Sequence, residues 1–576
     1  MTDKNKVFRA HVALTTYDVL LAIFEQIPSV PSTGSSTPLK YRDLKACALV
    51  SRAWAEPALC TLWSDLPSLF PLWHLLAPPD LPYPRVLSEP EPEYLQALVS
   101  AKLHEDPARW EQFLRYARRV HSLTAEHGRS TLQLDLARTV FDHNQGVSVF
   151  SSLKELYWIS DSMFDVVAFS PLLLTPTLRS ATLCSLGPMP GLHGVVLFNG
   201  FMNGGGPLTA AYGMLLRLAR SSPHLNALHF RGAHQITSVS DAVRAQPSFG
   251  HLRTVSFTCP VSHSALLVFA AKPHLESIQA SRIIPDKPPL SVASRPRTPT
   301  SSTLVHLDIS GDWVSLRQLF DMLDAPTLQS AALNIDKLEE LQSPDYVACT
   351  TAFAQAVSSA TFTRLELSTS GRVPSRPGVA DPIPFPSAAV LHAILEPLLA
   401  LHNLRSFSLS SFAVLFRVND DALERVARGW PRLVDFSIPV VLLGVRDGRP
   451  TRDLDGAVPT ARALHHFWRY CPDLRTLVLP RLDLSCVTVK DLPPPPPEGS
   501  THALAELRVL TGKYVANQPQ GELPDDEAKA LASYIHRLFP SLRLDDRHCQ
   551  APGIQNYGEP GVPVAWRKVF TYLHDL

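Results

Sequence analysis

The sequence predicts an α/β chain in which a short helical module precedes a long, irregular repeat solenoid. Two observations predict it: apolar residues near the start recur at helical spacing, and one apolar-x-x-apolar-x-apolar frame recurs through most of the remaining chain. The strands would form a parallel sheet on one face of the solenoid, with helices on the other. At 576 residues the chain is too long for one compact core, which favours such an elongated architecture.

Composition narrows the class of partner. Lys plus Arg and Asp plus Glu each number 53, so no global field draws the chain to nucleic acid or to a membrane, and we expect neither as a partner. The 8 cysteines include no CxxC pair, so the sequence indicates neither a zinc site nor a redox pair. Free thiols and a start without an apolar signal segment predict a cytoplasmic or nuclear protein.

Three helices are expected before residue 70. The first has its apolar side chains on one face, at Val19, Leu20, Ile23, Phe24 and Ile27, and Pro28 ends it. After a Ser/Pro/Gly stretch, Asp43 begins a second helix that Pro57 closes, and a third helix follows. So small a unit cannot bury Phe24, Trp54 and Trp63 together, so we expect these rings to be partly exposed for a partner.

The order of these residues closely resembles the F-box. The matching positions are Leu14, Val19, Leu20, Ile23, Phe24, Ile27, Leu44, Leu49, Val50, Ser51, Arg52, Trp54, Ala58, Leu62, Trp63 and Leu66. The resemblance implies a module that docks onto a Skp-type adaptor, which connects it to a cullin–RING ubiquitin ligase. It implies adaptor contacts from Val19, Leu20, Ile23, Phe24, Ile27, Leu44, Leu49, Val50, Trp54, Leu62 and Trp63.

Two features depart from the F-box pattern. Leu14-Thr15 stands where the family has Leu-Pro, and the first interhelical loop is longer. Both lie outside the helical faces. The alternative is a three-helix bundle that only caps the next domain.

The repeat frame fills the rest of the chain. Its clearest instances begin at Leu153, Leu178, Leu225, Leu252, Leu275, Leu304, Leu328, Phe362, Leu404, Leu433, Leu474 and Leu504, with weaker ones at Val120 and Phe539. Successive spacings include 25, 27, 23, 29 and 24 residues, and helical stretches lie between the frames. This pattern resembles the divergent leucine-rich repeats common in fungal F-box proteins. A doubly wound α/β enzyme would also alternate strands and helices, but the sequence lacks its Gly-rich phosphate loops.

The predicted organisation has four parts. They are an F-box-like domain at 10–70, a Pro-rich and helical linker at 71–119, a leucine-rich-repeat-like solenoid at 120–550 and a C-terminal tail at 551–576.

Side chains alternate along a strand, so the residue between the last two apolar positions of each frame faces the open side of the sheet. The candidate contacts with a target protein in this column are Tyr157, His229, Asp308, Glu366 and Arg508. The long loops around Pro296 and Pro377 are the alternative site for the target.

No GxSxG or HExxH motif suggests catalysis, and we expect no enzyme activity, cofactor or metal. The proline run 493–497 is either a polyproline II ligand for a partner or a stiff loop. The two resemblances together imply a non-catalytic substrate receptor, whose F-box docks to the adaptor while the repeats bind the target. The alternative is a repeat scaffold that acts outside a ubiquitin ligase.

Overall fold

The protein is described by a computed structural model. It forms two compact units, Met1–Cys259 and Pro260–Leu576, called unit 1 and unit 2. The structure describes residues 16–27, 39–78, 81, 92–100, 106–126, 131–159, 169–185, 207–232, 249–285, 298–299, 302–336, 345–369, 393–411, 418–438, 445–446, 449–450, 459–480, 482–484, 489–497, 499, 501–510, 523–543 and 564–576.

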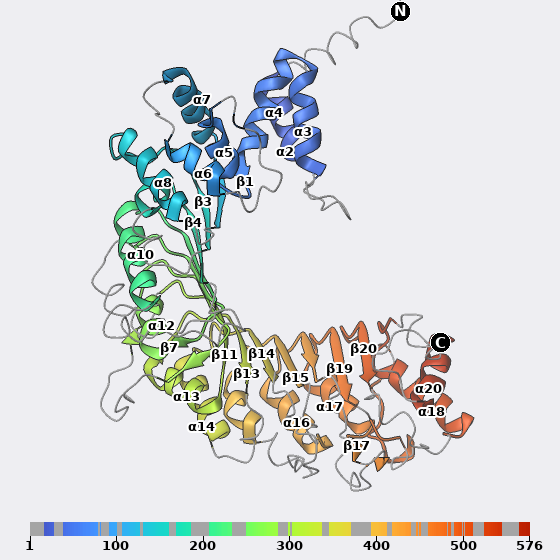
Figure 1. Cartoon of the computed structure of the whole chain (residues 1–576). Helices are drawn as coiled ribbons and strands as arrows, with labels where there is room; N and C mark the ends of the chain where they lie inside the picture. The colour runs from blue at the N-terminus through green and yellow to red at the C-terminus, as the bar shows by residue number, and fades with distance from the viewer. Residues whose placement is uncertain are drawn as a thin grey trace, which may run out of the picture. The chain divides into compact units, whose positions relative to one another are not determined.

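Unit 1 begins with three helices and continues into a run of parallel strands (Figure 1). The strands pair in chain order: β1 (Asp65–Leu66), β2 (Ser122–Glu126), β3 (Glu155–Ile159), β4 (Ser180–Ser185), β5 (Ala227–Gly232) and β6 (Thr254–Phe257). The helices are α2 (Tyr17–Glu25), α3 (Leu39–Val50), α4 (Arg52–Ser64), α5 (Phe70–Leu75), α6 (Pro92–Ser100), α7 (Pro107–Ala117), α8 (Thr131–His143) and α10 (Pro207–Ser221).

Unit 2 repeats the same strand–helix alternation. Its main strands also pair in parallel and in chain order: β8 (Ser277–Ala280), β11 (His306–Gly311), β13 (Ser330–Ile335), β14 (Arg364–Thr369), β15 (Ser406–Ser411), β16 (Asp435–Ser437), β19 (Thr476–Pro480) and β20 (Glu506–Leu510). The α-helices are α12 (His263–Ala270), α13 (Trp313–Met322), α14 (Asp345–Ala356), α16 (Asp420–Gly429), α17 (Arg462–Tyr470), α18 (Asp525–Leu538) and α20 (Val564–His574).

Smaller elements complete unit 2. They are the strand pairs β7 (Val261–Ser262) with β9 (Ile283–Ile284), β10 (Thr298–Pro299) with β12 (Leu323–Asp324) and β17 (Val445–Arg446) with β18 (Arg449–Pro450), and the 3₁₀ helices η3 (Glu396–Ala400) and η4 (Val489–Asp491).

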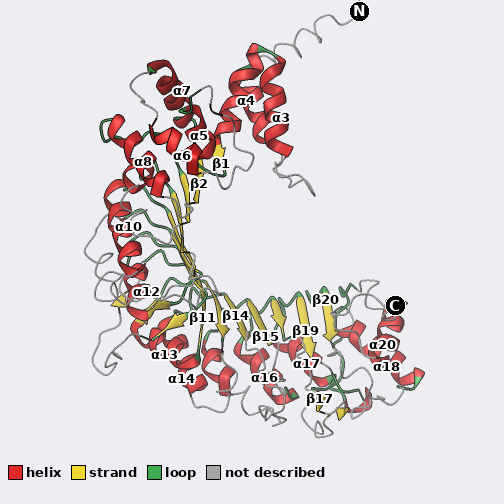
Figure 2. Ribbon diagram, viewed as in Figure 1, coloured by secondary structure: helices red, strands yellow, loops and turns green. Residues whose placement is uncertain are grey.

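The apolar positions of the repeat frame build the core. In the frame that contains β14, for example, Phe362, Leu365 and Leu367 are 0%, 1% and 2% exposed, and burying each such side chain contributes about 1.5–3 kcal/mol. In unit 2 the helices α13, α14, α16 and α17 lie on one side of the strands (Figure 2). The predicted α/β class with parallel strands is therefore confirmed, and the arrangement within each unit is consistent with a solenoid.

A repeated backbone hydrogen-bond pattern joins successive frames. The carbonyl just before most of the main strands accepts two N–H groups from the next repeat, as when Arg179 and Ser180 both donate to Lys154 O at 2.7 and 2.9 Å. Near the other end of the chain, Ala505 and Glu506 both donate to Arg475 O at 2.9 Å. Each repeat is thereby fixed in register with its neighbour before the ladder bonds of the strands begin.

The segment expected to be a Pro-rich and helical linker contains packed helices where the structure describes it. It supplies most of α5 together with α6 and α7, and Trp73 and Phe113 stack with ring centroids 6.2 Å apart while only 3% and 0% exposed. The strands also begin before residue 120, because Asp65 and Leu66 of β1 pair with β2. Burial of these large aromatic side chains stabilises the packed helices.

The expected C-terminal tail also ends in a packed helix. Trp566 of α20 is 0% exposed, and its indole N–H donates to Leu482 O at 3.2 Å. Lys568 Nζ lies 3.1 Å from Asp525 Oδ1 of α18. Helix α20 therefore covers the last repeats, whereas residues 551–563 lie outside the described part of the chain.

Helix boundaries in the N-terminal module differ from those expected from its prolines. The break between the second and third helices falls at Ser51, whose hydroxyl accepts the N–H of Trp54 at 3.3 Å and so caps α4. Pro57 lies inside α4 and does not end a helix. It stands just after the first turn, where its missing N–H removes one intrahelical hydrogen bond.

A buried histidine makes unit 2 sensitive to acid. His502 is 5% exposed, its Nδ1 accepts the N–H of Leu504 at 3.1 Å, and its Nε2–H donates to Cys471 O at 2.9 Å. Burial lowers the pKa of His502, so the unfolded chain, with a pKa of about 6.5, binds the proton more readily. Stability is therefore complete above the unfolded pKa and falls as the pH drops through the lower folded-state pKa.

We expect the thermal unfolding midpoint of the protein to be lower at about pH 5.5 than at about pH 7.5. His502→Gln keeps a donor and an acceptor but cannot titrate, so the decrease in the midpoint should be smaller in this variant. Part of the decrease should remain, because burial also lowers the pKa of His465. Calorimetry at both pH values measures the difference. An unchanged pH dependence in the variant would show that His502 does not titrate on unfolding.

Candidate functional site

The three-helix module, α2 to α4, has a small core of its own. Leu20, Phe24, Leu44 and Ala58 are its buried residues, and Ile27, Cys47, Ala48, Trp54 and Leu62 pack against them. The rings of Phe24 and Trp54 meet edge to face with centroids 5.7 Å apart. The apolar periodicity of the sequence therefore identifies the face on which the helices pack together.

Several residues expected at an adaptor interface belong to this core. Leu20, Phe24 and Leu44 are 1%, 2% and 0% exposed, so the expectation that Phe24 is partly exposed is wrong. Trp54 and Trp63 are half-buried, and the Trp63 ring packs on Tyr116 of α7 at 4.5 Å between centroids. These aromatic side chains hold the module together and hold it against α7, because three short helices need every large ring for their own packing.

A second group of predicted residues is exposed. Val19 and Ile23, one turn apart on α2, are 40% and 47% exposed, while Leu49 and Val50 at the end of α3 are 81% and 65% exposed. With Tyr17 at 43%, the module holds five of the large hydrophobic side chains found exposed in the described part of the protein; the other three are Val147, Val314 and Leu576. The large hydrophobic side chains that are exposed among the described residues are therefore concentrated on the three-helix module.

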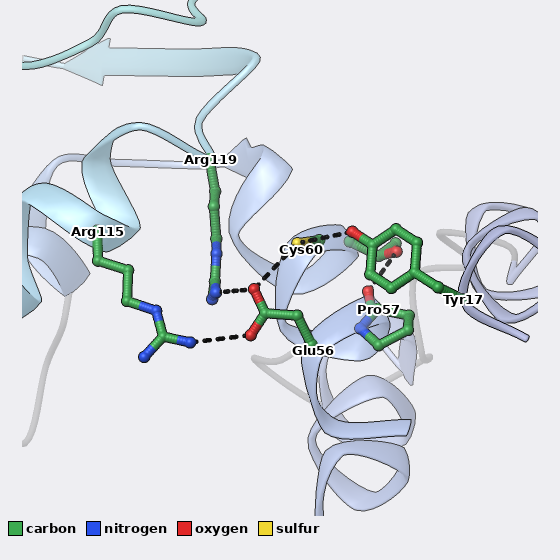
Figure 3. A network of polar contacts seen from close by, with 7 residues as sticks. Tyr17, Glu56, Pro57, Cys60, Arg115 and Arg119 are labelled. Atoms are coloured by element: carbon green, nitrogen blue, oxygen red, sulfur yellow. Dashed lines mark hydrogen bonds and ion pairs between the residues drawn. The ribbon is translucent and has the colours of Figure 1, made fainter. Parts of the chain in front are cut away.

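A polar network joins the module to α7 (Figure 3). The Glu56 carboxylate on α4 accepts hydrogen bonds from the guanidinium groups of Arg115, at 3.0 Å, and Arg119. Arg119 has a side chain only 10% exposed, and its Nη1 is buried without a hydrogen-bond partner among the described residues. Because Glu56 is far from both arginines in sequence, no local motif predicted this link.

Tyr17 extends the network to α2. Its hydroxyl donates to Cys60 Sγ at 3.4 Å, and Cys60 Sγ in turn lies 3.9 Å from Glu56 Oε1. The hydrogen bond with Cys60, followed by burial, raises the pKa of Tyr17 to about 12, so the phenol stays protonated and keeps donating. All three elements α2, α4 and α7 therefore meet at Glu56 and Cys60.

The candidate target contacts of unit 1 lie in one row across its strands. Register places Tyr157, Thr182, His229 and Ser256 side by side on β3 to β6. The Arg231 guanidinium lies 5.7 Å from the centre of the Tyr157 ring, and burial, aided by Arg231, lowers the pKa of His229. Tyr157 and His229 thus lie two strands apart as expected, both half-buried.

The corresponding row of unit 2 contains the other three candidates. Asp308 and Glu366 lie on β11 and β14 with Ala332 between them, and Arg508 ends the row on β20. Asp308 Oδ2 accepts from Gln279 Nε2 at 3.0 Å, and Arg508 pairs with Glu506. Asp308 and Arg508 thus each have a polar partner on the strands, and the row offers a balanced polar surface more than a concentrated charge.

The proline run and the predicted loops lie outside these two rows. The run at 493–497 is partly buried, and the carbonyl of Pro496 accepts from Arg537 Nη2 of α18 at 3.2 Å, which favours the stiff-loop interpretation. The predicted loops around Pro296 and Pro377, and Leu14 of the F-box pattern, lie outside the described residues.

Sequence comparison assigns this chain to no family. No protein-family profile matches the chain, and no curated protein matches it significantly. Among the described residues, no group of three His, Cys, Asp or Glu side chains is placed to hold a metal ion. The described helices include none with the length and apolar character to span a membrane.

The Glu56 network predicts unequal effects of its two arginines. Arg119→Met removes a largely buried donor and should lower the free energy of unfolding by about 1–3 kcal/mol. Arg115, 64% exposed, provides the matched control, and Arg115→Met should cost less than about 1 kcal/mol. Denaturant unfolding followed by tryptophan fluorescence measures both. Equal effects would mean that Glu56 is not the anchor between α4 and α7.

Proposed function

We propose that the protein is a non-catalytic substrate receptor of a cullin–RING ubiquitin ligase. In this function the three-helix module docks onto a Skp-type adaptor, and the strand–helix repeats bind the protein to be ubiquitinated. The observation that supports it best is the exposed apolar group on a module whose core is already complete. Val19, Ile23, Leu49 and Val50 lie outside that core and are 40%, 47%, 81% and 65% exposed, and they occupy positions that the F-box resemblance assigns to adaptor contact.

The energetics favour a docking role for these side chains. Covering a Leu or Ile side chain contributes about 1.5–3 kcal/mol, and a few such anchors dominate a typical protein interface. A module that left them uncovered would expose a hydrophobic surface without benefit to its own stability.

The link to α7 gives the proposed receptor a defined geometry. The Glu56 ion pairs and the Trp63–Tyr116 contact fix the docking module against the helices beside the first strands. A receptor acts by proximity: it holds a lysine of the target near the charged conjugating enzyme, while other subunits of the ligase supply the chemistry. A fixed module limits the positions that a bound target samples, which favours transfer.

The test uses binding of a purified Skp-type adaptor to the full chain, measured by calorimetry. Ile23→Gln combined with Leu49→Gln should weaken binding by about 2–4 kcal/mol, roughly 30- to 1,000-fold, because two apolar anchors are lost. Val147→Gln, an equally exposed apolar position of unit 1 outside the module at 62%, should bind normally.

Two results would contradict the proposal. Undiminished binding by the double variant would place the interface elsewhere. Failure of the wild-type chain to bind any Skp-type adaptor would instead favour the repeat scaffold acting outside a ubiquitin ligase.

A further inference from the structure

The edge at which strands β3 to β6 of unit 1 begin carries a concentration of positive charge. Its three cations, Lys154, Arg179 and Arg253, stand at the second position of the repeat frame, immediately before β3, β4 and β6. All three side chains are exposed, and the Arg179 guanidinium donates to His224 O at 3.3 Å. We call these three residues the basic surface.

The backbone fixes the spacing of the frame's second positions. Arg179 N–H donates to Lys154 O, Asn226 N–H donates to Arg179 O, and Arg253 N–H donates to Asn226 O, at 2.7, 2.7 and 2.8 Å. Successive second positions therefore follow the separation of parallel strands, about 4.8 Å, which places Arg179 and Arg253 about 10 Å apart. The charges form a row across the strands and not a single cluster.

The surroundings reinforce the positive character. The residues beside the row include exposed His224 and His251, with ring centroids 5.5 Å apart, and half-buried His229. At the second, third and fifth frame positions of β3 to β6, the one carboxylate among the described residues is Glu155. Three permanent cations against this one anion leave a net charge of +2.

Unit 2 lacks this bias. The same three frame positions there carry the carboxylates of Glu276, Asp308, Glu366, Asp435 and Glu506 and the cations of Arg364, Arg405, Arg475 and Arg508. The positive charge of unit 1 is therefore a local feature in a chain whose Lys plus Arg and Asp plus Glu counts are equal at 53. The sequence shows this excess of positive charge at the second position of the frame. The position between the last two apolar residues does not show it.

We infer that the basic surface binds an extended acidic segment of a partner protein, one whose carboxylates face Lys154, Arg179 and Arg253. In an extended segment, side chains on the same side recur every 6.5–7 Å or so, about the spacing that flexible Lys and Arg side chains on neighbouring strands reach. The inference goes beyond the proposed function, since it holds whether or not the module docks onto an adaptor.

Other anions fit the row less well. A single phosphate is held by donors that converge on one point, whereas these cations stand before three different strands, β3, β4 and β6. A nucleic acid requires more cations, about 6–10 for tight phosphate-driven binding, and accessible aromatic faces on which bases stack. The Tyr157 ring on this surface is covered by Arg231.

The experiment measures fluorescence anisotropy of a short labelled peptide with Glu at every second position, titrated with the full chain at low salt. A peptide with Gln in place of Glu is the uncharged control. We expect the Glu peptide to bind, the Gln peptide not to bind, and affinity to fall as salt screens the charges.

Two variants locate the site. Lys154→Glu with Arg179→Glu should weaken the Glu peptide about tenfold or more, and the milder Lys154→Gln with Arg179→Gln about threefold. Arg405→Glu with Arg475→Glu is the matched control, because these exposed residues occupy the same frame position in unit 2, and it should bind normally.

Four outcomes would overturn the inference. They are absence of binding by the Glu peptide, equal binding by the Gln peptide, equal losses in the unit 2 control, and tighter binding of a single-stranded RNA or of anionic phosphatidylserine vesicles through Lys154 and Arg179. Adaptor binding measured on the same variants should be unchanged, which separates this result from that of the proposed function.

Discussion

The structure depends on one repeated constraint: the carbonyl group before most of the main strands accepts two N–H groups from the next repeat, and a single one at the two ends of the series. The series begins where His121 N–H donates to Ser64 O at 2.8 Å, and within unit 2 it reaches Arg543, whose N–H donates to Ala505 O at 2.9 Å. Each such group would otherwise be a buried, unsatisfied backbone acceptor, which is costly. The constraint sets the register in which the frame's apolar side chains stack into a core.

The same constraint connects the helical module to the repeats. Ser64 is the last residue of α4, so the module's third helix passes directly into the first paired strand. Glu56 on that helix is held by Arg115 and Arg119, and Trp63 packs on Tyr116. The docking module is thus attached through backbone pairing, ion pairs and aromatic contact together, which matches the need of a receptor to present its target in a fixed position. The row that contains Lys154 and Arg179 is fixed by the same carbonyl groups.

The sequence was sufficient to predict where the strands lie but not which side chains form the exposed surfaces. The frame has a short period, and its apolar residues can be buried only in the core of the repeats. Strands such as β11 and β14 therefore lie where the pattern predicted them. For the module, helical spacing identified the apolar residues but could not divide them: Phe24 is in the core, whereas Leu49 is 81% exposed. That division depends on how three helices meet. The contacts of Trp566 with Leu482 and of Glu56 with Arg119 join residues far apart in the chain, beyond any local pattern.

Hydrogen exchange of the purified chain, with and without a saturating Skp-type adaptor, tests the docking role of the module most directly. We predict that the adaptor slows exchange in α2 around Val19 and Ile23 and at the end of α3 around Leu49 and Val50. Exchange in β11 to β15 should not change. Protection confined to the strands, or absent from α2 and α3, would contradict the assignment of the exposed apolar side chains to an adaptor.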